Sequence, residues 1–255
     1  MIDTHCHLDA PEFSIDRDTL VQQALAQGMA RLVVPAVSAR LFAAVKNTVL
    51  RYPVCVAAYG IHPLYIAEAT ADDLTTLVQW LATENPVAVG EIGLDFYVDR
   101  QDAEKQAAFF SAQLDLAREF DLPVILHVRK AIDQVLKHLR RHKVQGGIAH
   151  AFNGSRQQAD EFIKLGFKLG FGGAMTYSGS TRIRQLAAML PLESIVLETD
   201  APDIPPVWLN RGRNTPVELL RIAQVLADLR GVSLAEVSRV TSEAARQALP
   251  GLSGE

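Results

Sequence analysis

Eight short apolar segments recur along the chain, and this repetition constrains the fold more than any other feature. Each segment is rich in aliphatic residues, many of them β-branched, which is typical of strands that are buried on both faces. Strands of this kind pair in parallel, so they need helical crossovers between them. The segments span residues 1–8, 30–37, 54–63, 87–96, 123–129, 146–152, 167–173 and 194–200.

The stretches between these segments have the periodicity of helices. Apolar residues recur three and four positions apart at 18–28, 74–82, 104–120 and 182–191, which predicts amphipathic helices there. Strands that alternate with helices indicate parallel βα units. Capping signals agree with this reading: the predicted N-caps are Ser38, Ser155 and Thr215, and the predicted ends are Gly28, Gly166 and Gly231.

Eight βα units fit the length of the chain, because a (β/α)8 barrel takes about 250 residues and this chain has 255. We predict an α/β fold: a single TIM barrel domain over residues 1–255, with an extra C-terminal helix at 233–249 that closes or braces the barrel. An open, doubly wound sheet is the structural alternative. No linker, low-complexity tract or charge block divides the chain.

Composition excludes several classes of protein. The formal net charge of -4 argues against a protein that coats duplex DNA through an overall positive field, so any contact with nucleic acid is expected to be local. No apolar run reaches the roughly 18 residues of a membrane span, and no signal segment is evident. We therefore expect a cytoplasmic protein without a membrane partner or an evident obligate protein partner. Cys6 and Cys55 form no CxxC pattern and are expected to be reduced.

Residues that commonly bind metals gather where the predicted strands end. His5 and His7 form a His-x-His pair, and alternate residues of a strand share one face. Barrel enzymes carry their chemistry at the C-terminal ends of the strands. A carboxylate buried there needs a cation or several hydrogen-bond donors to offset its desolvation. Each residue alone could be a hydrogen-bonded core residue, but together they predict a metal site: His5, His7, Glu91, His127, His150 and Asp200.

Seven motifs occur in order along the whole chain: HCHLD at 5–9, GIHP at 60–63, GEIGLDF at 90–96, LHVR at 126–129, HAFNGS at 150–155, ETDAP at 198–202 and NRGRNTP at 210–216. As a set they resemble the TatD family of metal-dependent hydrolases, in particular its YjjV-type bacterial branch. The resemblance implies a distorted TIM barrel with a two-metal centre. It places His5, His7 and Asp200 on one ion, His127 and His150 on the other, and Glu91 between the two.

Such a centre implies hydrolysis, because paired cations activate water and neutralise charge at phosphorus. Asp200 is assigned general-base character as a hypothesis, and Glu91 is the second catalytic candidate. We predict an ester-bond hydrolase (EC 3.1), a phosphodiesterase or deoxyribonuclease that acts on nucleic-acid ends. A carboxylic ester or amide hydrolase, such as an aminoacyl-tRNA deacylase, is the alternative on the same scaffold. A non-catalytic metal-binding protein is the third reading, disfavoured because no expected ligand is missing.

The ligand chemistry and the resemblance point to different metals. Four imidazoles favour Zn, Mn, Ni or Co over Mg, which prefers oxygen ligands. The family resemblance implies magnesium-dependent nuclease activity. We expect two divalent ions per chain, with Zn, Mn or another transition ion found bound and Mg as an option for the working enzyme.

Three further residues are expected to support the site. His62 lies in a His-Pro turn, where it could orient a ligand, touch substrate or cap the loop. Glu198 shares the strand face of Asp200 and is expected to orient a metal ligand. Asp95 is a candidate for the same task or for ordering its loop.

Charge placement suggests where a polyanionic substrate lies. Loops after the first four strands are acid-rich, whereas those after the last four carry Arg and Lys, which predicts a basic half of the rim. Arg129, on the strand face of His127, and Arg213, in the NRGRNTP motif, are the candidate substrate contacts. Lys130 departs from the acidic residue that the family commonly has there, which bears on substrate choice.

Overall fold

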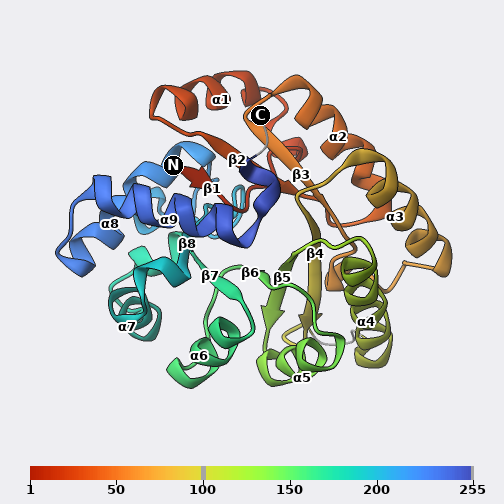
Figure 1. Cartoon of the computed structure of the whole chain (residues 1–255). Coiled ribbons are helices and arrows are strands. Elements are labelled where there is room, and N and C mark those ends of the chain that lie inside the picture. The colour runs from red at the N-terminus through yellow and green to blue at the C-terminus, as the bar shows by residue number, and fades with distance from the viewer. Residues whose placement is uncertain (99–101, 254–255) are drawn as a thin grey trace.

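Eight parallel strands form the centre of the structure, a computed structural model that describes residues 1–98 and 102–253. Each strand pairs with the next in sequence, in the order β1 to β8, and Figure 1 shows the resulting ring with helices outside it. The predicted TIM barrel is therefore confirmed, and the open doubly wound sheet is not found. The strands are β1 (Ile2–Asp3), β2 (Arg31–Pro35), β3 (Cys55–Tyr59), β4 (Ala88–Asp95), β5 (Val124–Arg129), β6 (Gly147–Ala149), β7 (Phe167–Phe171) and β8 (Ile195–Leu197).

The barrel is nearly closed, and single hydrogen bonds bridge the seam between β8 and β1. The backbone N–H of Thr4 donates to the carbonyl of Leu197 at 3.0 Å. The N–H of Asp200 donates to the carbonyl of His5 at 2.8 Å. Two segments that begin and end the barrel, almost 200 residues apart in sequence, are thereby held side by side.

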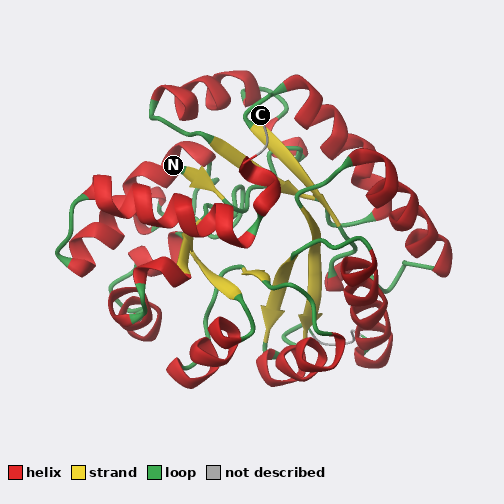
Figure 2. Cartoon of the chain, viewed as in Figure 1, coloured by secondary structure: helices red, strands yellow, loops and turns green. Residues whose placement is uncertain are grey.

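Helices cover the outside of the barrel (Figure 2). The predicted cap at Ser155 is confirmed, because its side chain accepts a hydrogen bond from the N–H of Gln158. Gly28, Gly166 and Gly231 follow helices with positive φ angles, as predicted. Ser38 and Thr215 instead precede short 3₁₀ turns and make no side-chain cap. The helices are α1 (Arg17–Ala26), α2 (Phe42–Arg51), α3 (Ala71–Glu84), α4 (Ala103–Glu119), α5 (Ile132–His142), α6 (Arg156–Lys164), α7 (Thr181–Met189), α8 (Leu219–Arg230) and α9 (Leu234–Ala248).

The last helix seals one end of the barrel. Figure 1 shows α9, in blue, crossing in front of β1 and β8. Ala244, Ala245 and Ala248 of α9 join a buried apolar cluster with strand residues such as Ile2 and Ile125. Small alanine side chains let the helix approach the strand ends closely. The predicted bracing role of the C-terminal helix is confirmed.

Three predicted strands are shorter than expected at the ends that carry metal-binding residues. β1 stops at Asp3, β6 at Ala149 and β8 at Leu197. Beyond Asp3, the N–H of His5 donates to the Asp3 side chain and that of His7 to the Ala201 carbonyl, instead of to a neighbouring strand. The placement of both histidines within a regular strand was therefore wrong, and they lie on the loop that follows it.

Two other expectations can be compared with the structure. Cys6 and Cys55 are both buried and unbridged, which confirms that they form no disulfide. Among the described residues, no helix combines the length and apolar character needed to cross a membrane.

Candidate metal centre

Histidine and carboxylate side chains converge at the C-terminal ends of the strands, at the bottom of a cavity of about 1370 Å³. All six predicted metal ligands belong to this cluster, and five of them line the cavity. Three of the six are almost fully buried, since the side chains of His5, Glu91 and His150 are 0%, 2% and 5% exposed, and the other three are half-buried. The strands thus bring together residues that are up to 195 positions apart in sequence.

One half of the cluster consists of His5, His7 and Asp200. The Nε2 atoms of the two histidines lie 3.3 Å apart. The Oδ1 atom of Asp200 lies 3.5 Å from Nε2 of His5 and 3.8 Å from Nε2 of His7. Asp200 reaches this position with a positive φ of 57°. Nδ1 of His7 faces the carbonyl of Pro35 at 3.2 Å, which leaves its Nε2 directed toward the cluster.

Glu91 lies between this half and a second group of histidines. Its Oε2 atom is 3.2 Å from Nε2 of His5 and 3.7 Å from Nε2 of His7. Its Oε1 atom is 3.1 Å from Nδ1 of His127 and 3.3 Å from Nε2 of His150. The two oxygens of one carboxylate therefore face two different sets of imidazoles.

The donor set fits divalent cations. Three overlapping groups have all their ligand atoms within 4.8 Å of one another: His5 with His7 and Asp200, His5 with Glu91 and His150, and His62 with Glu91 and His127. Nδ1 of His5, a fully buried residue, has no hydrogen-bond partner. Imidazole nitrogens with carboxylate oxygens suit Zn, Mn and related transition ions. The groups leave room for more than one ion, because Glu91 belongs to two of them.

Electrostatics in the cluster are strongly coupled. Burial raises the pKa of Glu91, but the surrounding histidines, led by His62 and His5, outweigh it and hold that pKa well below its usual range. Burial lowers the pKa of His150, yet the carboxylates of Asp200 and Glu91 overcome this and raise it to about 10. Burial raises the pKa of Asp200 to about 6, against the effect of His150. The buried charges thus shift the pKa of Glu91 downward and the pKa values of His150 and Asp200 upward.

His62 differs from the other histidines of the cluster in its hydrogen bonds. Its Nδ1 accepts the N–H of Leu64 at 3.1 Å, so the neutral ring carries its proton on Nε2. That Nε2 lies 3.5 Å from Oε1 of Glu91. Burial lowers the pKa of His62 to about 3, with Glu91 opposing. In this neutral form Nε2 is a hydrogen-bond donor, and it would have to lose that proton to act as a ligand in the group with Glu91 and His127.

Two buried carboxylates stand behind the cluster and contact its histidines. Oδ2 of Asp95 lies 2.9 Å from Nε2 of His127, which leaves Nδ1 of that ring facing Glu91. Oε1 of Glu198 lies 3.4 Å from Nδ1 of His150 and accepts the N–H of Ala151 at 2.6 Å. Carboxylates in such places fix the tautomer and orientation of ligating imidazoles. Asp95 and Glu198 therefore each lie beside a candidate metal ligand, where the sequence analysis expected them.

The two arginine candidates lie in different surroundings. The guanidinium of Arg129 lies 3.8 Å from the ring centroid of Tyr97, and both residues line the cavity. Arg213 instead pairs with the Asp16 carboxylate at 2.5 Å and donates to the carbonyl of Glu12. It connects the loops that follow β8 and β1, and it is not among the residues that line the cavity. The basic half-rim is thus smaller than the sequence suggested.

Known proteins that resemble this chain identify its family. The family described as TatD-related DNase matches residues 2–250. The chain belongs to the TatD family. It is 41% identical to the uncharacterised metal-dependent hydrolase YjjV of Escherichia coli K12 over 93% of both chains. The crystal structure of YjjV superposes with a TM-score of 0.94 at 39% identity, covering 98% of each chain. The protein named 3'-5' ssDNA/RNA exonuclease TatD from Erwinia billingiae is 32% identical, over 91% of this chain and 92% of its own.

As a TatD-family member the chain is a metal-dependent hydrolase. A TatD family protein from Entamoeba histolytica shares the fold at a TM-score of 0.86 and 19% identity, over 98% of this chain and 97% of that one. The predicted recognition and fold are therefore both confirmed. The TatD barrel positions the cluster described above at its C-terminal face.

Sequence reasoning missed Asp3, which holds the metal-binding loops of this TatD chain together. Its buried carboxylate accepts the N–H of His5 at 3.2 Å and the N–H of Thr199 at 3.0 Å. It also accepts the hydroxyl of Thr199 at 2.7 Å. Asp3 thereby connects the residue before Asp200 to His5. An acidic residue in the first apolar segment was the signal that could have identified it.

Two buried glutamines on α4 were also missed. Gln113 accepts the N–H of Ile61 at 2.7 Å and donates to its carbonyl at 3.1 Å. Gln106 makes the same pair of bonds with the backbone of Asp95, at 2.9 and 3.0 Å. The two are seven residues apart and lie on one face of the helix. Polar residues within the apolar stripe of 104–120 were the available signal.

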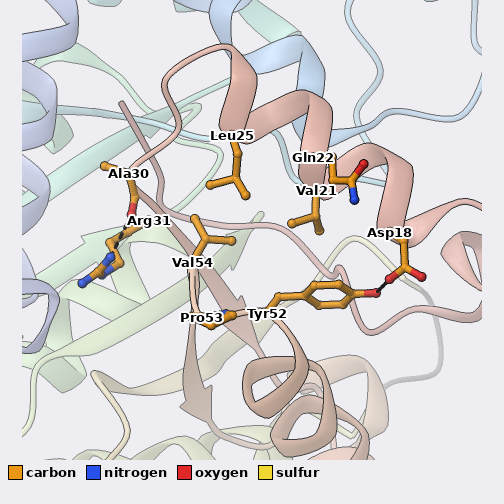
Figure 3. A pocket seen from close by; sticks show the side chains of 9 residues that line it. All are labelled: Asp18, Val21, Gln22, Leu25, Ala30, Arg31, Tyr52, Pro53 and Val54. Carbon is orange, nitrogen blue, oxygen red and sulfur yellow. Dashed lines mark hydrogen bonds between the residues drawn. The ribbon is translucent and has the colours of Figure 1, made fainter.

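A second hollow, of about 560 Å³, lies at the other ends of the strands, beside α1 and before β2 and β3. Figure 3 shows its lining, with the Tyr52 hydroxyl directed at the Asp18 carboxylate. Asp18 also pairs with Arg51 at 2.5 Å. No histidine lines this hollow, so among the described residues the convergence of ligating groups belongs to the C-terminal face.

Proposed function

We propose that this TatD-family hydrolase is a phosphodiesterase that acts on nucleic-acid ends through a centre of two divalent metal ions. The observation that carries the proposal is the position of Glu91, whose two oxygens face two different histidine sets. A carboxylate so placed could hold two ions at the 3.5 to 4 Å separation of two-metal phosphoesterases. His5, His7 and Asp200 would hold one ion, and His127 and His150 the other.

When bound, the two ions supply an activated water and offset the negative charge that develops at the reacting phosphate. The residues around them supply the rest. Asp200 accepts the proton of the attacking water, because its carboxylate lies in the cluster and its pKa of about 6 is close to neutrality. His62 donates its Nε2 proton to a phosphate oxygen, because the N–H of Leu64 occupies its other nitrogen. Asp95 and Glu198 fix the ring orientations of His127 and His150.

Relatives support the choice of substrate. Two proteins named 3'-5' ssDNA/RNA exonuclease TatD, from Erwinia species, match this chain at 31–32% identity over at least 91% of its length. The described cavity is large enough for a nucleotide, since ligand pockets usually span about 300–1,000 Å³. Arginine and lysine residues on one wall provide contacts for phosphate.

The proposal can be tested with single-stranded oligonucleotides labelled at the 3' or the 5' end. Enzyme loaded with Mn²⁺, Zn²⁺ or Mg²⁺ in separate reactions should shorten the strand from one end, and EDTA should stop the reaction. An aminoacyl-ester substrate, assayed in parallel, distinguishes the carboxylic ester alternative. Hydrolysis of that ester with no cleavage of either oligonucleotide would overturn the proposal.

A matched variant excludes contaminating nuclease. Asp200→Asn should keep most of the bound metal and lose at least 100-fold in turnover, in the usual range for loss of a general base. Wild-type and variant protein are purified in parallel, and bound metal is measured by elemental analysis. Equal turnover in the two preparations would contradict the role of Asp200.

A further inference from the structure

We propose that Arg129, Lys130 and Arg182 form a second phosphate-binding subsite, one step toward the mouth of the cavity from the metal centre. The subsite would take the next phosphate of a substrate whose scissile phosphate lies at the metals. This inference rests on the proposed function and specifies its substrate further, as a phosphoester that carries a second phosphate group. All three cations line the same cavity as the histidines of the centre.

Arg129 sets the distance of the subsite from the centre. It follows His127 by two residues on β5, so the two side chains leave the same face of the strand about 7 Å apart. Exposure rises along this strand from buried Leu126, through half-buried His127, to exposed Arg129, which places Arg129 nearer the mouth. Stacking on Tyr97 at 3.8 Å restricts the guanidinium and leaves its N–H groups available to an anion.

Among the residues that the structure describes, Lys130 is a cation without a partner. It is exposed, and the described residues give its ammonium neither a hydrogen bond nor an ion pair. Other basic residues of the same rim are engaged: Arg156 pairs with Asp160 at 2.9 Å, and Arg184 donates to the Met175 carbonyl at 3.0 Å. The backbone of Lys130 has a positive φ of 57°, a conformation that costs free energy in a residue other than glycine. That strained turn directs the chain from β5 into α5 at the cavity wall.

Arg182 completes the set from α7. Its guanidinium donates to Oδ1 of Asn153 at 2.8 Å. This bond fixes one edge of the guanidinium and leaves the N–H groups of the other edge available to an anion. Asp133, which lines the same cavity, accepts a hydrogen bond from Gln158 at 2.9 Å, so its charge is partly satisfied. Asp9, Glu12 and Asp203 line the cavity from the loops that follow β1 and β8. Guanidinium and ammonium groups such as those of Arg129, Lys130 and Arg182 are common binding partners of phosphate oxygens.

Binding of small nucleotides to the metal-loaded enzyme tests the subsite without any need for turnover. Thymidine 3',5'-bisphosphate should bind about tenfold more tightly than either thymidine 5'-monophosphate or thymidine 3'-monophosphate, as expected for one charge-assisted contact. Lys130→Glu should abolish this difference. Lys130→Asn, which tolerates the left-handed backbone conformation, should reduce it. Calorimetry measures all three affinities.

The control is Lys137→Glu, the same charge reversal on the exposed face of α5, away from the cavity lining. It should retain the preference for the bisphosphate. Equal affinity for the bisphosphate and the tighter monophosphate in wild-type enzyme would overturn the subsite, and so would equal effects of the Lys130 and Lys137 variants.

Kinetics separate the subsite from the proposed function. The dinucleotide TpT is compared with pTpT and TpTp, which each add one terminal phosphate. A lower KM for one of the phosphorylated forms, lost in Lys130→Glu and retained in Lys137→Glu, supports the subsite. If no dinucleotide is cleaved but the bisphosphate preference persists and depends on Lys130, the proposed function fails and the subsite stands. Cleavage of all three with equal KM overturns the subsite alone.

Discussion

The side chain of Glu91 is tightly restrained, because imidazole nitrogens lie beside each of its two carboxylate oxygens. Its side chain is 2% exposed and lies within 3.7 Å of imidazole nitrogens on both sides. A neutral amide at this position could not replace both contacts, since one end of an amide donates and cannot bind a cation. The role of Glu91 therefore depends on both of its oxygens.

We predict that Glu91→Gln lowers the bound metal from two ions to one or none and reduces turnover by at least 100-fold. The physical reason is the loss of one of the two carboxylate oxygens, each of which faces one of the two proposed ion positions. Elemental analysis of dialysed protein measures the stoichiometry. Asp16→Asn, a carboxylate substitution on the exposed rim, serves as the control. Two ions retained in Glu91→Gln would contradict a bridging role.

Metal binding should release protons, because the carboxylates around His150 raise its pKa to about 10 against the effect of burial. A metal requires the neutral ring, so between pH 6 and 9 the proton of His150 must leave, and affinity should rise about tenfold per pH unit. Burial raises the pKa of Asp200 to about 6, so below pH 6 this carboxylate is protonated as well. Metal binding must then release a second proton, and the metal affinity should depend on pH more steeply. Calorimetry of Mn²⁺ binding at pH 5.5, 7 and 8.5 in several buffers measures both effects. An affinity independent of pH would contradict this electrostatic account.

At the scale of elements, the strand ends decide what the sequence could and could not predict. The interior of β4 has every residue buried, and its apolar run predicted its bounds within one residue. β1 and β8 were predicted three to five residues too long, because the residues that follow them were interpreted as a continuation of each strand. Side-chain acceptors such as Asp3 replace strand pairing there, and no local sequence pattern reveals partners almost 200 residues away.

Helix α4 controls the loop that carries His62 through Gln113. We predict that Gln113→Leu lowers the free energy of unfolding by about 2 kcal/mol, since it leaves a buried N–H and C=O of Ile61 without partners. Turnover should fall as well, because His62 follows Ile61 directly. Urea denaturation and steady-state kinetics measure the two effects.

The matched control is Gln79→Leu on the exposed face of α3. It makes the same change in side chain where no buried backbone group depends on it, and stability should shift by less than about 0.5 kcal/mol. A Gln113 variant as stable and as active as the Gln79 variant would show that α4 does not hold the loop.

At the scale of the whole molecule, the metal centre should contribute to stability, because its ligands come from both sides of the seam between β8 and β1. A ligand present at 1,000 times its Kd stabilises the folded state by about 4 kcal/mol. For a chain of this size this corresponds to roughly 8–16 °C in Tm. Thermal unfolding with excess Mn²⁺ and with EDTA measures the difference. Equal midpoints would show that the ions do not connect the two sides.

The overall barrel and the six-residue cluster were predictable because both depend on repetition. Eight strand segments have similar composition, and the five that carry the ligand candidates bring those residues together at one face once the barrel closes. The tautomer of His62 and the pairing of Arg213 with Asp16 were not predictable, since they depend on contacts between loops. We propose that the chain is one domain, as its continuous repeat suggests.

The seal that α9 makes at one end of the barrel has a topological consequence. A polymer cannot thread through the barrel, because side chains fill its interior and α9 covers its other end. Under the proposed function, a nucleic-acid end would therefore approach the centre and leave it on the same face of the molecule.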